Sequence, residues 1–424
     1  MMQSKTLVLA AGFLGLTTPA MAANLFVPSN DYPTIQSAID AARDGDNVLI
    51  SDGRYEETLR IVDKSLNFYG RGTHPGHTSI VSPSGRHEIA SSQLRFSLIG
   101  FHSEQVFDHR IPLDPGEDGL LIHYSTVEFS MCEFDRLVSW YTTNSLGDAG
   151  AIEMWQSDVS LSRCVFEGNG ALSNKPYWAS VARGGAIYAA SSTLDIEDCL
   201  FEFNYARADR GVRSPWGCGA EGGAIYMSGC DFTSTGTRYE QNRATGVDGG
   251  SVPSMLHGGA IYASYPVSMH LERSYFIENR AAFGEVENAD ESYTGGAMYI
   301  SHGRNNAEYL KHCRFTENHA ADGGGAVYSS GGGRTKSNNC EYDCNTSTQN
   351  EGDWFNSGGN VFNECPEPPA RGDFNGDGNV DIKDLMELYY SWGKVTPGSK
   401  YDLNGDGIVD SRDVVGFIVT RYGK

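Results

Sequence analysis

Beyond its first residues, the sequence has no apolar stretch long enough to cross a membrane. The early apolar run extends from Leu7 to Leu16, short of the roughly 20 residues that a transmembrane helix needs. Lys5 precedes this run and Ala20-Met21-Ala22 follows it, as in a secretory signal peptide with its cleavage site. We therefore expect residues 1–22 to be removed after Ala22 and the protein to be secreted or held at the cell surface.

Basic residues are scarce as well. The chain has 32 Lys and Arg residues against 54 Asp and Glu residues, a formal net charge of −22 at pH 7. Nucleic-acid binding requires a basic surface for the phosphates, so this balance argues against it. Clustered carboxylates instead favour divalent cations.

Glycine is abundant, at 51 of 424 residues, but it follows no G-X-Y period, which excludes a collagen-like triple helix. Instead, a GGA string recurs from Gly184, Gly222, Gly258, Gly295 and Gly324, with a weaker copy (AGA) from Ala149. An F/Y-x-x-N string follows each copy after 17 to 20 residues, whereas the full period varies from 29 to 38 residues. A constant core with a variable segment predicts one coil of a solenoid with a loop inserted at one corner.

Each repeat core contains short apolar runs, such as AIYA, STLDI and CLFEF, without a helical period. Three short strands per coil, each paired with its counterpart in the next coil, form a parallel β-helix, which is an all-β fold. Asparagines at the end of the core are expected to stack on one another: Asn169, Asn204, Asn242, Asn279, Asn318 and Asn345.

Most of the nine cysteines recur two residues before the aromatic position of the repeat, where stacking of reduced, buried side chains is expected. They are Cys132, Cys164, Cys199, Cys313 and Cys340, with Thr237 and Ser274 in the same place in two further coils. Cys218 with Cys230, and Cys344 with Cys365, remain as candidate disulfides.

The GGAI and F-x-x-N strings, between about residues 149 and 345, resemble the repeats of polymorphic outer-membrane proteins. The segment from Tyr32 to Ile61 is similar to the entry module of pectin-lyase-like β-helices. The resemblance implies a right-handed parallel β-helix over residues 23–365. One face of a short helix would cap its open end, through Ile35, Ala38, Ile39 and Ala42.

The variable segments, residues 170–183, 205–221, 243–257 and 280–294, leave the coil at the same corner and are predicted to form one surface of loops. Aromatic side chains on these loops are candidate carbohydrate contacts: Tyr177, Trp178, Trp216 and Tyr293, with Arg183, Arg210 and Arg213 beside them. Packing of the same rings against the coil is the alternative interpretation.

The sequence lacks the catalytic strings that the resemblance would supply. The paired aspartates and Gly-His-Gly string of polygalacturonase-like hydrolases do not occur, nor does a recurring basic-plus-acidic cluster like that of pectate lyases. His257 is a candidate acid–base group, although a lone histidine is more often structural. The coil carboxylates lie in scattered registers, which favours a solvated face over an acid–base pair: Glu153, Asp195, Glu197, Glu240 and Glu272. No catalytic residue is assigned.

A proline-rich linker, residues 366–372, precedes a C-terminal module of residues 373–424. The module contains two twelve-residue loops, DFNGDGNVDIKD and DLNGDGIVDSRD, whose oxygen ligands have the spacing of calcium loops with glycine at position 6. We expect each loop to hold one Ca²⁺ ion. The predicted ligands are Asp373, Asn375, Asp377, Asn379 (carbonyl), Asp381 and Asp384 in the first loop, and Asp402, Asn404, Asp406, Ile408 (carbonyl), Asp410 and Asp413 in the second.

An amphipathic helix is predicted after each loop, with Leu385, Leu388, Tyr389 and Trp392 on one face of the first and Val415, Ile418, Val419 and Tyr422 on one face of the second. Duplicated loop-helix units with Asp at position 12 resemble a type I dockerin, which implies docking onto a cohesin domain. The recognition positions of that family hold Ile382-Lys383 and Ser411-Arg412, so the two halves differ and the frequent Ser-Thr pair is absent.

Three functions remain open at this point. The chain is an exported β-helix that binds polysaccharide and is anchored by its dockerin-like module, a polysaccharide lyase or glycoside hydrolase with a different kind of site, or a surface adhesin or spacer. The first is favoured.

Overall fold

The computed structural model describes residues 21–83, 85–103, 119–141, 147–175, 180–210, 218–247, 255–281, 292–302, 307–320, 322–331, 334–345, 350–352, 354–363, 382–394, 401, 408–410 and 413–414. The chain divides into two compact units, residues 1–361 and 362–424. The first unit ends shortly before the predicted domain end at residue 365.

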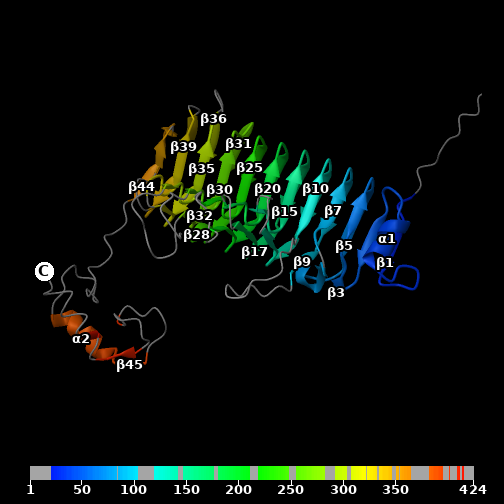
Figure 1. The fold of residues 1–424 in the computed structure, drawn as a ribbon, viewed down its shortest axis with the longest axis horizontal. Coiled ribbons are helices and arrows are strands. Elements are labelled where there is room, and N and C mark those ends of the chain that lie inside the picture. Colours follow the sequence, from blue (N-terminus) through cyan, green and yellow to red (C-terminus); the bar gives the residue numbers. More distant parts are fainter. Residues whose placement is uncertain are drawn as a thin grey trace, which may run out of the picture. The chain divides into compact units, whose positions relative to one another are not determined.

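The first unit is a parallel β-helix, as predicted. Three long parallel sheets run along it (Figure 1), and each coil except those at the two ends contributes one strand to each sheet. Within the described residues, sheet A contains β1 (Asn24–Val27), β2 (Asn47–Ile50), β5 (Ser65–Gly70), β8 (Gln93–Ser97), β11 (Thr126–Ser130), β16 (Asp158–Ser162), β21 (Thr193–Glu197), β26 (Asp231–Thr235), β31 (Ser268–Glu272), β36 (Ala307–Lys311), β40 (Arg334–Asn338) and β43 (Trp354–Asn356).

The other two long sheets follow the same stacking order. Sheet B contains β3 (Gly53–Glu56), β6 (Thr78–Val81), β9 (Gly100–His102), β12 (Glu133–Asp135), β17 (Val165–Glu167), β22 (Leu200–Glu202), β27 (Arg238–Glu240), β32 (Tyr275–Ile277), β37 (Arg314–Thr316), β41 (Glu341–Asp343) and β44 (Val361–Asn363). Sheet C contains β4 (Arg60–Val62), β7 (His87–Ala90), β10 (Leu120–His123), β15 (Ile152–Trp155), β20 (Ile187–Ala190), β25 (Ile225–Ser228), β30 (Ile261–Ser264), β35 (Met298–Ser301), β39 (Val327–Ser330) and β42 (Asn350–Gly352).

The core lies inside the coil because alternate strand residues point inward. In β16, for example, Val159 and Leu161 are buried and Asp158 and Ser160 are exposed. The aromatic position of the repeat forms a continuous interior stack, with ring centroids 4.4 to 5.2 Å apart. Its members are Phe134, Phe166, Phe201, Tyr239, Phe276, Phe315 and Tyr342.

The predicted asparagine stack is confirmed. In each step the side-chain oxygen of one asparagine accepts bonds from the backbone N–H and the side-chain amide of the asparagine before it. Asn204 donates in this way to Asn242 with both distances at 3.0 Å, and Asn242 donates to Asn279 in the same manner. The stack holds the corner at which sheet B ends.

The predicted stack of reduced cysteines is also confirmed, since all five are buried and free. The backbone N–H of Cys164 lies 3.3 Å from the Sγ of Cys199, and the N–H of Cys199 donates to the hydroxyl of Thr237 at 3.3 Å.

The two candidate disulfides are wrong, because Cys230 and Cys344 are free thiols. Cys230 occupies the turn position that Ser157 and Ser192 hold in earlier coils. Its Sγ bonds to the carbonyl of Ser228, two residues back, as those serine hydroxyls do to theirs. Cys344 lies in the turn before Asn345, in a left-handed conformation with φ of 52°.

The capping helix is confirmed as α1 (Ile35–Ala41), and all four predicted face residues are buried. Thr34 and Ser37 form a capping box at its start, and the Glu57 carboxylate accepts from the N–H groups of Ile35 and Gln36 at 2.9 and 3.0 Å. A short 3₁₀ helix, η1 (Pro75–His77), interrupts the early coils.

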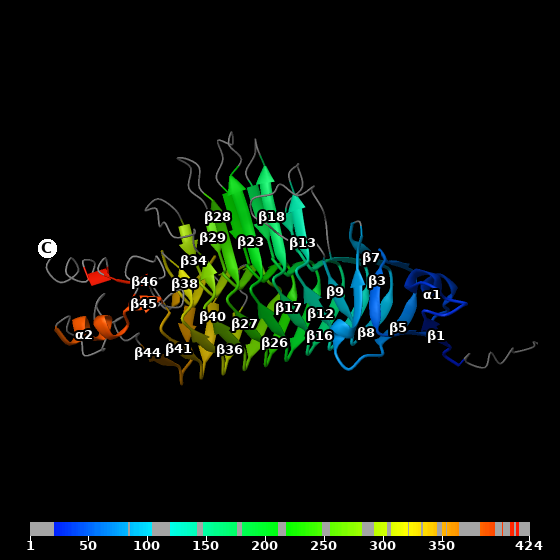
Figure 2. The same ribbon diagram turned by 90° about the horizontal axis from the view of Figure 1, so that it is seen from below.

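The variable segments contain more regular structure than predicted. Instead of loops alone, they contribute strands to two further parallel sheets, D and E, which stand out from one side of the coil (Figure 2). Their described strands are β13 (Val138–Tyr141), β18 (Gly170–Lys175), β23 (Tyr205–Arg210), β28 (Arg243–Val247), β33 (Arg280–Ala281) and β38 (His319–Ala320) in sheet D, and β14 (Gly147–Asp148), β19 (Ser180–Arg183), β24 (Cys218–Glu221), β29 (Met255–His257) and β34 (Ser292–Thr294) in sheet E.

Glycine is required where sheet E returns to sheet C. A Cβ on Gly223 would lie 2.0 Å from the carbonyl oxygen of Gly259 in the next coil, so no side chain fits between stacked turns. This close approach explains the GGA strings.

The second unit has α2 (Ile382–Tyr390) and a short antiparallel pair, β45 (Gly393–Lys394) and β46 (Ile408–Val409). Leu388 and Val409 are fully buried, and Leu385, Tyr401 and Val414 pack against them. Trp392 lies beyond the end of α2 and is half exposed, so the prediction that it lies on the same helix face as Leu385 and Leu388 is wrong. The predicted second helix face, Val415 to Tyr422, lies outside the described residues.

Candidate functional site

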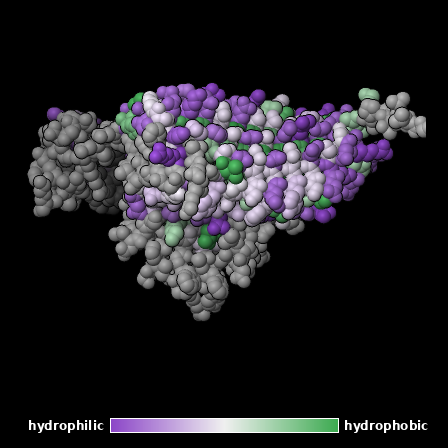
Figure 3. Space-filling model, turned by 90° about the horizontal axis from the view of Figure 1, so that it is seen from above, coloured by the Kyte–Doolittle hydropathy of each residue, from purple (hydrophilic) through white to green (hydrophobic). Residues whose placement is uncertain are grey.

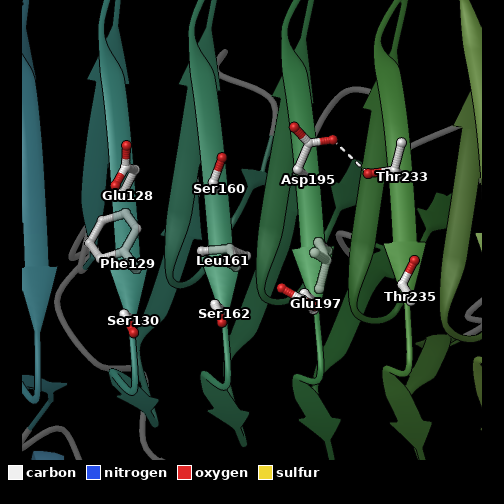
Figure 4. Close-up of a pocket in the computed structure, with 11 residues that line it drawn as sticks. Glu128, Phe129, Ser130, Ser160, Leu161, Ser162, Asp195, Glu197, Thr233 and Thr235 are labelled. Carbon is white, nitrogen blue, oxygen red and sulfur yellow. Dashed lines mark hydrogen bonds between the residues drawn. The ribbon is translucent and has the colours of Figure 1, made fainter.

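The outer face of sheet A carries a shallow trough over β11, β16, β21 and β26, with a volume of about 550 Å³ (Figure 4). Its outward side chains form two rows that follow the strand register. One row is Glu128, Ser160, Asp195 and Thr233, and the other is Ser130, Ser162, Glu197 and Thr235. We call these eight residues the sheet A trough.

The rows result from in-register parallel pairing. Phe129, Leu161 and Ile196 point into the core, so the residues on either side of each must point outward. Successive coils then place equivalent side chains about 4.8 Å apart along the solenoid. A polar group is therefore available at each step of a long ligand that lies along this axis.

Hydrogen bonds hold several trough side chains in place. The hydroxyl of Thr233 donates to the carboxylate of Asp195 at 2.5 Å (Figure 4). At the N-terminal end, Arg95 forms two bonds to Glu128, of 2.7 and 3.2 Å. Arg95 also lines an adjoining depression of about 220 Å³ with Asn67 and Gln93. On the side of the molecule drawn in Figure 3, the coloured residues are mostly hydrophilic or near neutral, with scattered hydrophobic positions.

Toward the C-terminus, the first row of the trough continues into aromatic residues. His270 is in register with Thr233 and stacks on Tyr309, with ring centroids 5.2 Å apart. The Lys336 ammonium group lies 5.1 Å from the centre of the Tyr309 ring, a cation–π distance.

The structure separates the carboxylates that the sequence offered as acid–base candidates. Asp195, Glu197 and Glu272 lie on sheet A, and the first two share the trough. Glu153 lies on sheet C in a largely buried ion pair with Arg86, and Glu240 lies on sheet B with Arg238 at 2.8 Å. Most of these carboxylates therefore serve ion pairs or solvated faces, as the sequence favoured.

His257 is buried at the base of sheet E. Its Nδ1 lies 2.8 Å from the hydroxyl of Thr294, and its ring stacks on Tyr299 with centroids 4.5 Å apart. Burial lowers the pKa of His257 to about 4. A neutral imidazole in this position has a structural role and is not placed to act on a polymer outside the coil.

Of the predicted carbohydrate contacts on the variable segments, the structure describes Tyr293 and contradicts it. Tyr293 is 1% exposed among the alanines of sheets D and E, so its ring is not available to a sugar and the packing interpretation holds for it. Arg183 forms an ion pair with Glu221 at 2.8 Å and lies over the Tyr226 ring. Tyr177, Trp178, Trp216 and Arg213, and the side chain of Arg210, lie outside what the structure describes.

Sequence reasoning missed a second aromatic stack, on the outer face of sheet C. The tyrosine after each GGA-x string stacks on the next, with centroids 4.9 to 5.4 Å apart: Tyr188, Tyr226, Tyr262, Tyr299 and Tyr328. The recurring GGAxY string in the sequence could have predicted this tyrosine stack. Because each ring covers its neighbour, this stack supports sheet E rather than offering free ring faces.

In the second unit, the described part of the calcium loops contains Asp384, Ile408, Asp410 and Asp413. Asp384 and Asp413, at position 12 of each loop, are both fully buried, and the Asp413 carboxylate accepts from the backbone N–H of Asp410 at 2.8 Å. Buried carboxylates at these positions fit a hard cation. The other predicted ligands lie outside the described residues: Asp373, Asn375, Asp377, Asn379, Asp381, Asp402, Asn404 and Asp406.

None of the described helices is long and apolar enough to span a membrane. No group of three or more His, Cys, Asp and Glu side chains converges on a metal position within the described ranges, which exclude most of the two loops.

Sequence profiles match two parts of the chain. The dockerin type I domain matches residues 371–419, and the Chlamydia polymorphic membrane protein repeat matches residues 312–330. Both resemblances seen in the sequence are thereby confirmed. No curated protein sequence matches the chain significantly.

Several solved structures align with much of the chain at low similarity. A pectin methylesterase in complex with a hexasaccharide is 10% identical, with a TM-score of 0.36, and the alignment covers 80% of this chain and 94% of that one. The pectin methylesterase PemA from Erwinia chrysanthemi is 12% identical, with a TM-score of 0.32 and coverage of 74% and 81%. An α-1,3-glucanase catalytic unit from Streptomyces thermodiastaticus is 14% identical, with a TM-score of 0.30 and coverage of 82% and 68%. These identities and TM-scores are too low to assign any property of those proteins to this chain.

Proposed function

We propose that this protein is an extracellular polysaccharide-binding β-helix that a calcium-dependent dockerin-like module attaches to a larger assembly. The β-helix presents the binding surface on sheet A, and the C-terminal unit docks onto a cohesin-type domain. The single observation that carries the binding function is the sheet A trough, in which eight polar side chains form two regular rows on a rigid scaffold.

The trough suits a polysaccharide for two reasons. Carboxylate and hydroxyl groups at about 4.8 Å intervals can bond to the hydroxyl groups of successive sugar units along the solenoid axis. The scaffold beneath is held by interior stacks of rings, asparagines and cysteines. Little conformational entropy is therefore lost when a ligand binds.

The attachment function rests on the dockerin type I match and on the two calcium loops. The side chains of Asp384 and Asp413 would hold the ions from position 12, together with the predicted ligands earlier in each loop. Calcium would neutralise the converging carboxylates, and its binding energy would contribute to the folding of this small unit. The differing recognition pairs, Ile382-Lys383 and Ser411-Arg412, favour one docking orientation over two equivalent ones.

Binding is tested with the full secreted chain and a panel of insoluble and soluble polysaccharides, by pull-down and affinity electrophoresis. A double variant, Asp195→Ala with Thr233→Val, removes the hydrogen-bonded pair in the trough and is expected to weaken binding at least tenfold. Glu341→Ala on sheet B, a half-exposed carboxylate away from the trough, serves as the matched control and should bind like the wild type. Unchanged binding by the double variant would exclude the trough.

The same panel distinguishes binding from cleavage. Release of reducing ends would identify a hydrolase, and release of unsaturated ends a lyase.

Attachment is tested by mixing the chain with cohesin domains, with and without a calcium chelator. Binding in calcium that is lost in chelator supports docking, and equal binding in both contradicts its dependence on calcium.

A further inference from the structure

A polar hollow lies at the corner where sheet C turns into sheet A. Its volume is about 340 Å³, and it spans three successive coils. Gln156, Ser191 and Gly229 line it at the turn, and Asp158, Thr193 and Asp231 line it at the start of sheet A. Gly229 contributes to the hollow directly, because a Cβ built there would meet no atom within 4 Å.

Tyrosines stand at the same turn position immediately before and after the hollow. Tyr124 precedes the coil of Gln156, and Tyr265 follows the coil of Gly229. Their exposed fractions are 66% and 62%. Four strand spacings separate them, which is about 19 Å along the axis. The arrangement is therefore a polar hollow with an exposed aromatic ring at each end.

Stability of the turn does not explain these tyrosines. From Asp63 to Tyr265 the residues at this position have positive φ, and Tyr124 and Tyr265 have values of 52° and 47°. This conformation is unfavourable for bulky residues, and Gln156, Ser191 and Gly229 fill it in the coils between. Two large rings are thus held in solvent at positions where glycine would suit the backbone better, which points to a ligand.

A third aromatic residue stands beside the hollow. Trp155 is the last residue of β15, directly before Gln156, and is 40% exposed. Its Nε1 donates to the Glu153 carboxylate at 2.8 Å, and its ring lies 5.2 Å from that of Tyr188. The indole is fixed in orientation with its polar atom already bonded, so what it offers to solvent is apolar ring surface.

The hollow and the sheet A trough form one acidic surface, because Asp158, Thr193 and Asp231 are followed two residues later by trough residues of the same strands. Five carboxylates line the hollow and the trough: Glu128, Asp158, Asp195, Glu197 and Asp231. Among the described lining residues of these two and the adjoining depression, the one permanent cation is Arg95, which is bound to Glu128. Such a surface repels a polyanion.

We infer that this corner binds an uncharged polysaccharide chain along the solenoid axis and excludes uronic-acid polymers. The inference rests on the proposed binding function and names its ligand class. Tyr124 and Tyr265 contact sugar faces at the two ends, Trp155 contacts the chain at its side, and the polar residues of the hollow bond to hydroxyl groups in between.

The experiment measures binding of the full secreted chain to a neutral β-glucan, to a neutral xylan and to polygalacturonate, at low salt. The neutral chains are expected to bind and polygalacturonate is not. Tyr124→Ala and Tyr265→Ala are each expected to weaken neutral binding about tenfold. Tyr275→Ala, a half-exposed tyrosine on sheet B, is the matched control and should bind like the wild type. Asp158→Asn with Asp231→Asn should allow polygalacturonate to bind.

The outcomes separate this inference from the proposed function. If the wild type binds no polysaccharide, the proposed function fails. If it binds neutral chains and neither tyrosine substitution matters, the corner site is overturned while the trough proposal stands. Stronger binding to polygalacturonate than to the neutral chains would overturn the charge argument alone.

Discussion

Asn242→Ala should strongly destabilise the solenoid, because Asn242 lies in the middle of the asparagine stack. Its side-chain oxygen accepts from the backbone N–H and the side-chain amide of Asn204, both at 3.0 Å. Its own amide donates to the carbonyl of Phe201 at 2.9 Å and to Asn279 at 3.0 Å. The substitution therefore removes four hydrogen bonds at a site with no exposed surface.

The expected loss follows from these four bonds. A typical hydrogen bond contributes about 1 kcal/mol net, and a buried group left without a partner costs about 1–3 kcal/mol. We expect the free energy of unfolding to fall by about 4 kcal/mol, a large part of the stability of an ordinary domain. Because coils contact only their neighbours, the loss of stability should be greatest in the substituted coil and the coils next to it. It should include β28 of sheet D, which begins directly after Asn242.

Urea denaturation followed by circular dichroism measures the loss, and hydrogen exchange locates it. Asn24→Ala is the matched control, because Asn24 is exposed on the first strand and accepts one bond, from Asn47 at 2.9 Å. That control should lose well under 1 kcal/mol. A loss below about 1 kcal/mol for Asn242→Ala would show that water replaces the missing bonds, and would refute the view that the stack holds this corner.

Three further predictions concern the turns, pH and calcium. Gly223→Ala should prevent folding because its Cβ would lie 2.0 Å from a carbonyl of the next coil, whereas Gly219→Ala, with its nearest contact at 3.6 Å, should be secreted normally. Burial lowers the pKa of His87 from 6.5 to about 4, so the unfolded chain binds a proton that the folded chain does not between these pH values. The contribution of His87 to stability should fall by up to about 1.4 kcal/mol per pH unit from pH 6.5 to 4 and be full above that window. His87→Gln should remove this share of the pH dependence in thermal melts, whereas the share of His257, whose pKa is also lowered to about 4, should stay. Asp413→Ala should reduce calcium uptake from two ions to one by calorimetry while the melting transition of the β-helix stays unchanged; full uptake would contradict the ligand assignment.

The repeated strings carry the information that predicted the fold. GGA marks turns at which backbone of the next coil leaves no room for a Cβ, and F/Y-x-x-N places one ring and one asparagine in the stacks of each coil that carries it. Both strings are local and recur along the chain, so a single sequence is enough to predict the coil from them. The calcium loops are local in the same sense, because all predicted ligands of each ion lie within twelve residues.

The sequence did not predict sheets D and E, since their strands carry few alternating apolar residues and pair only because stacked coils bring them side by side. The candidate disulfides failed for a related reason: spacing suggested pairs, but Cys230 fills the turn position of its own coil and Cys344 is a free thiol.

The binding surface was likewise decided by tertiary structure. Asp158, Asp195 and Asp231 are unremarkable in sequence, and variable segments of different lengths separate Tyr124 from Tyr265. Only the strand register, which brings equivalent positions of successive coils to about 4.8 Å from one another, makes them neighbours on one face. The sequence determined which residues repeat, and coil stacking decided which of the others meet.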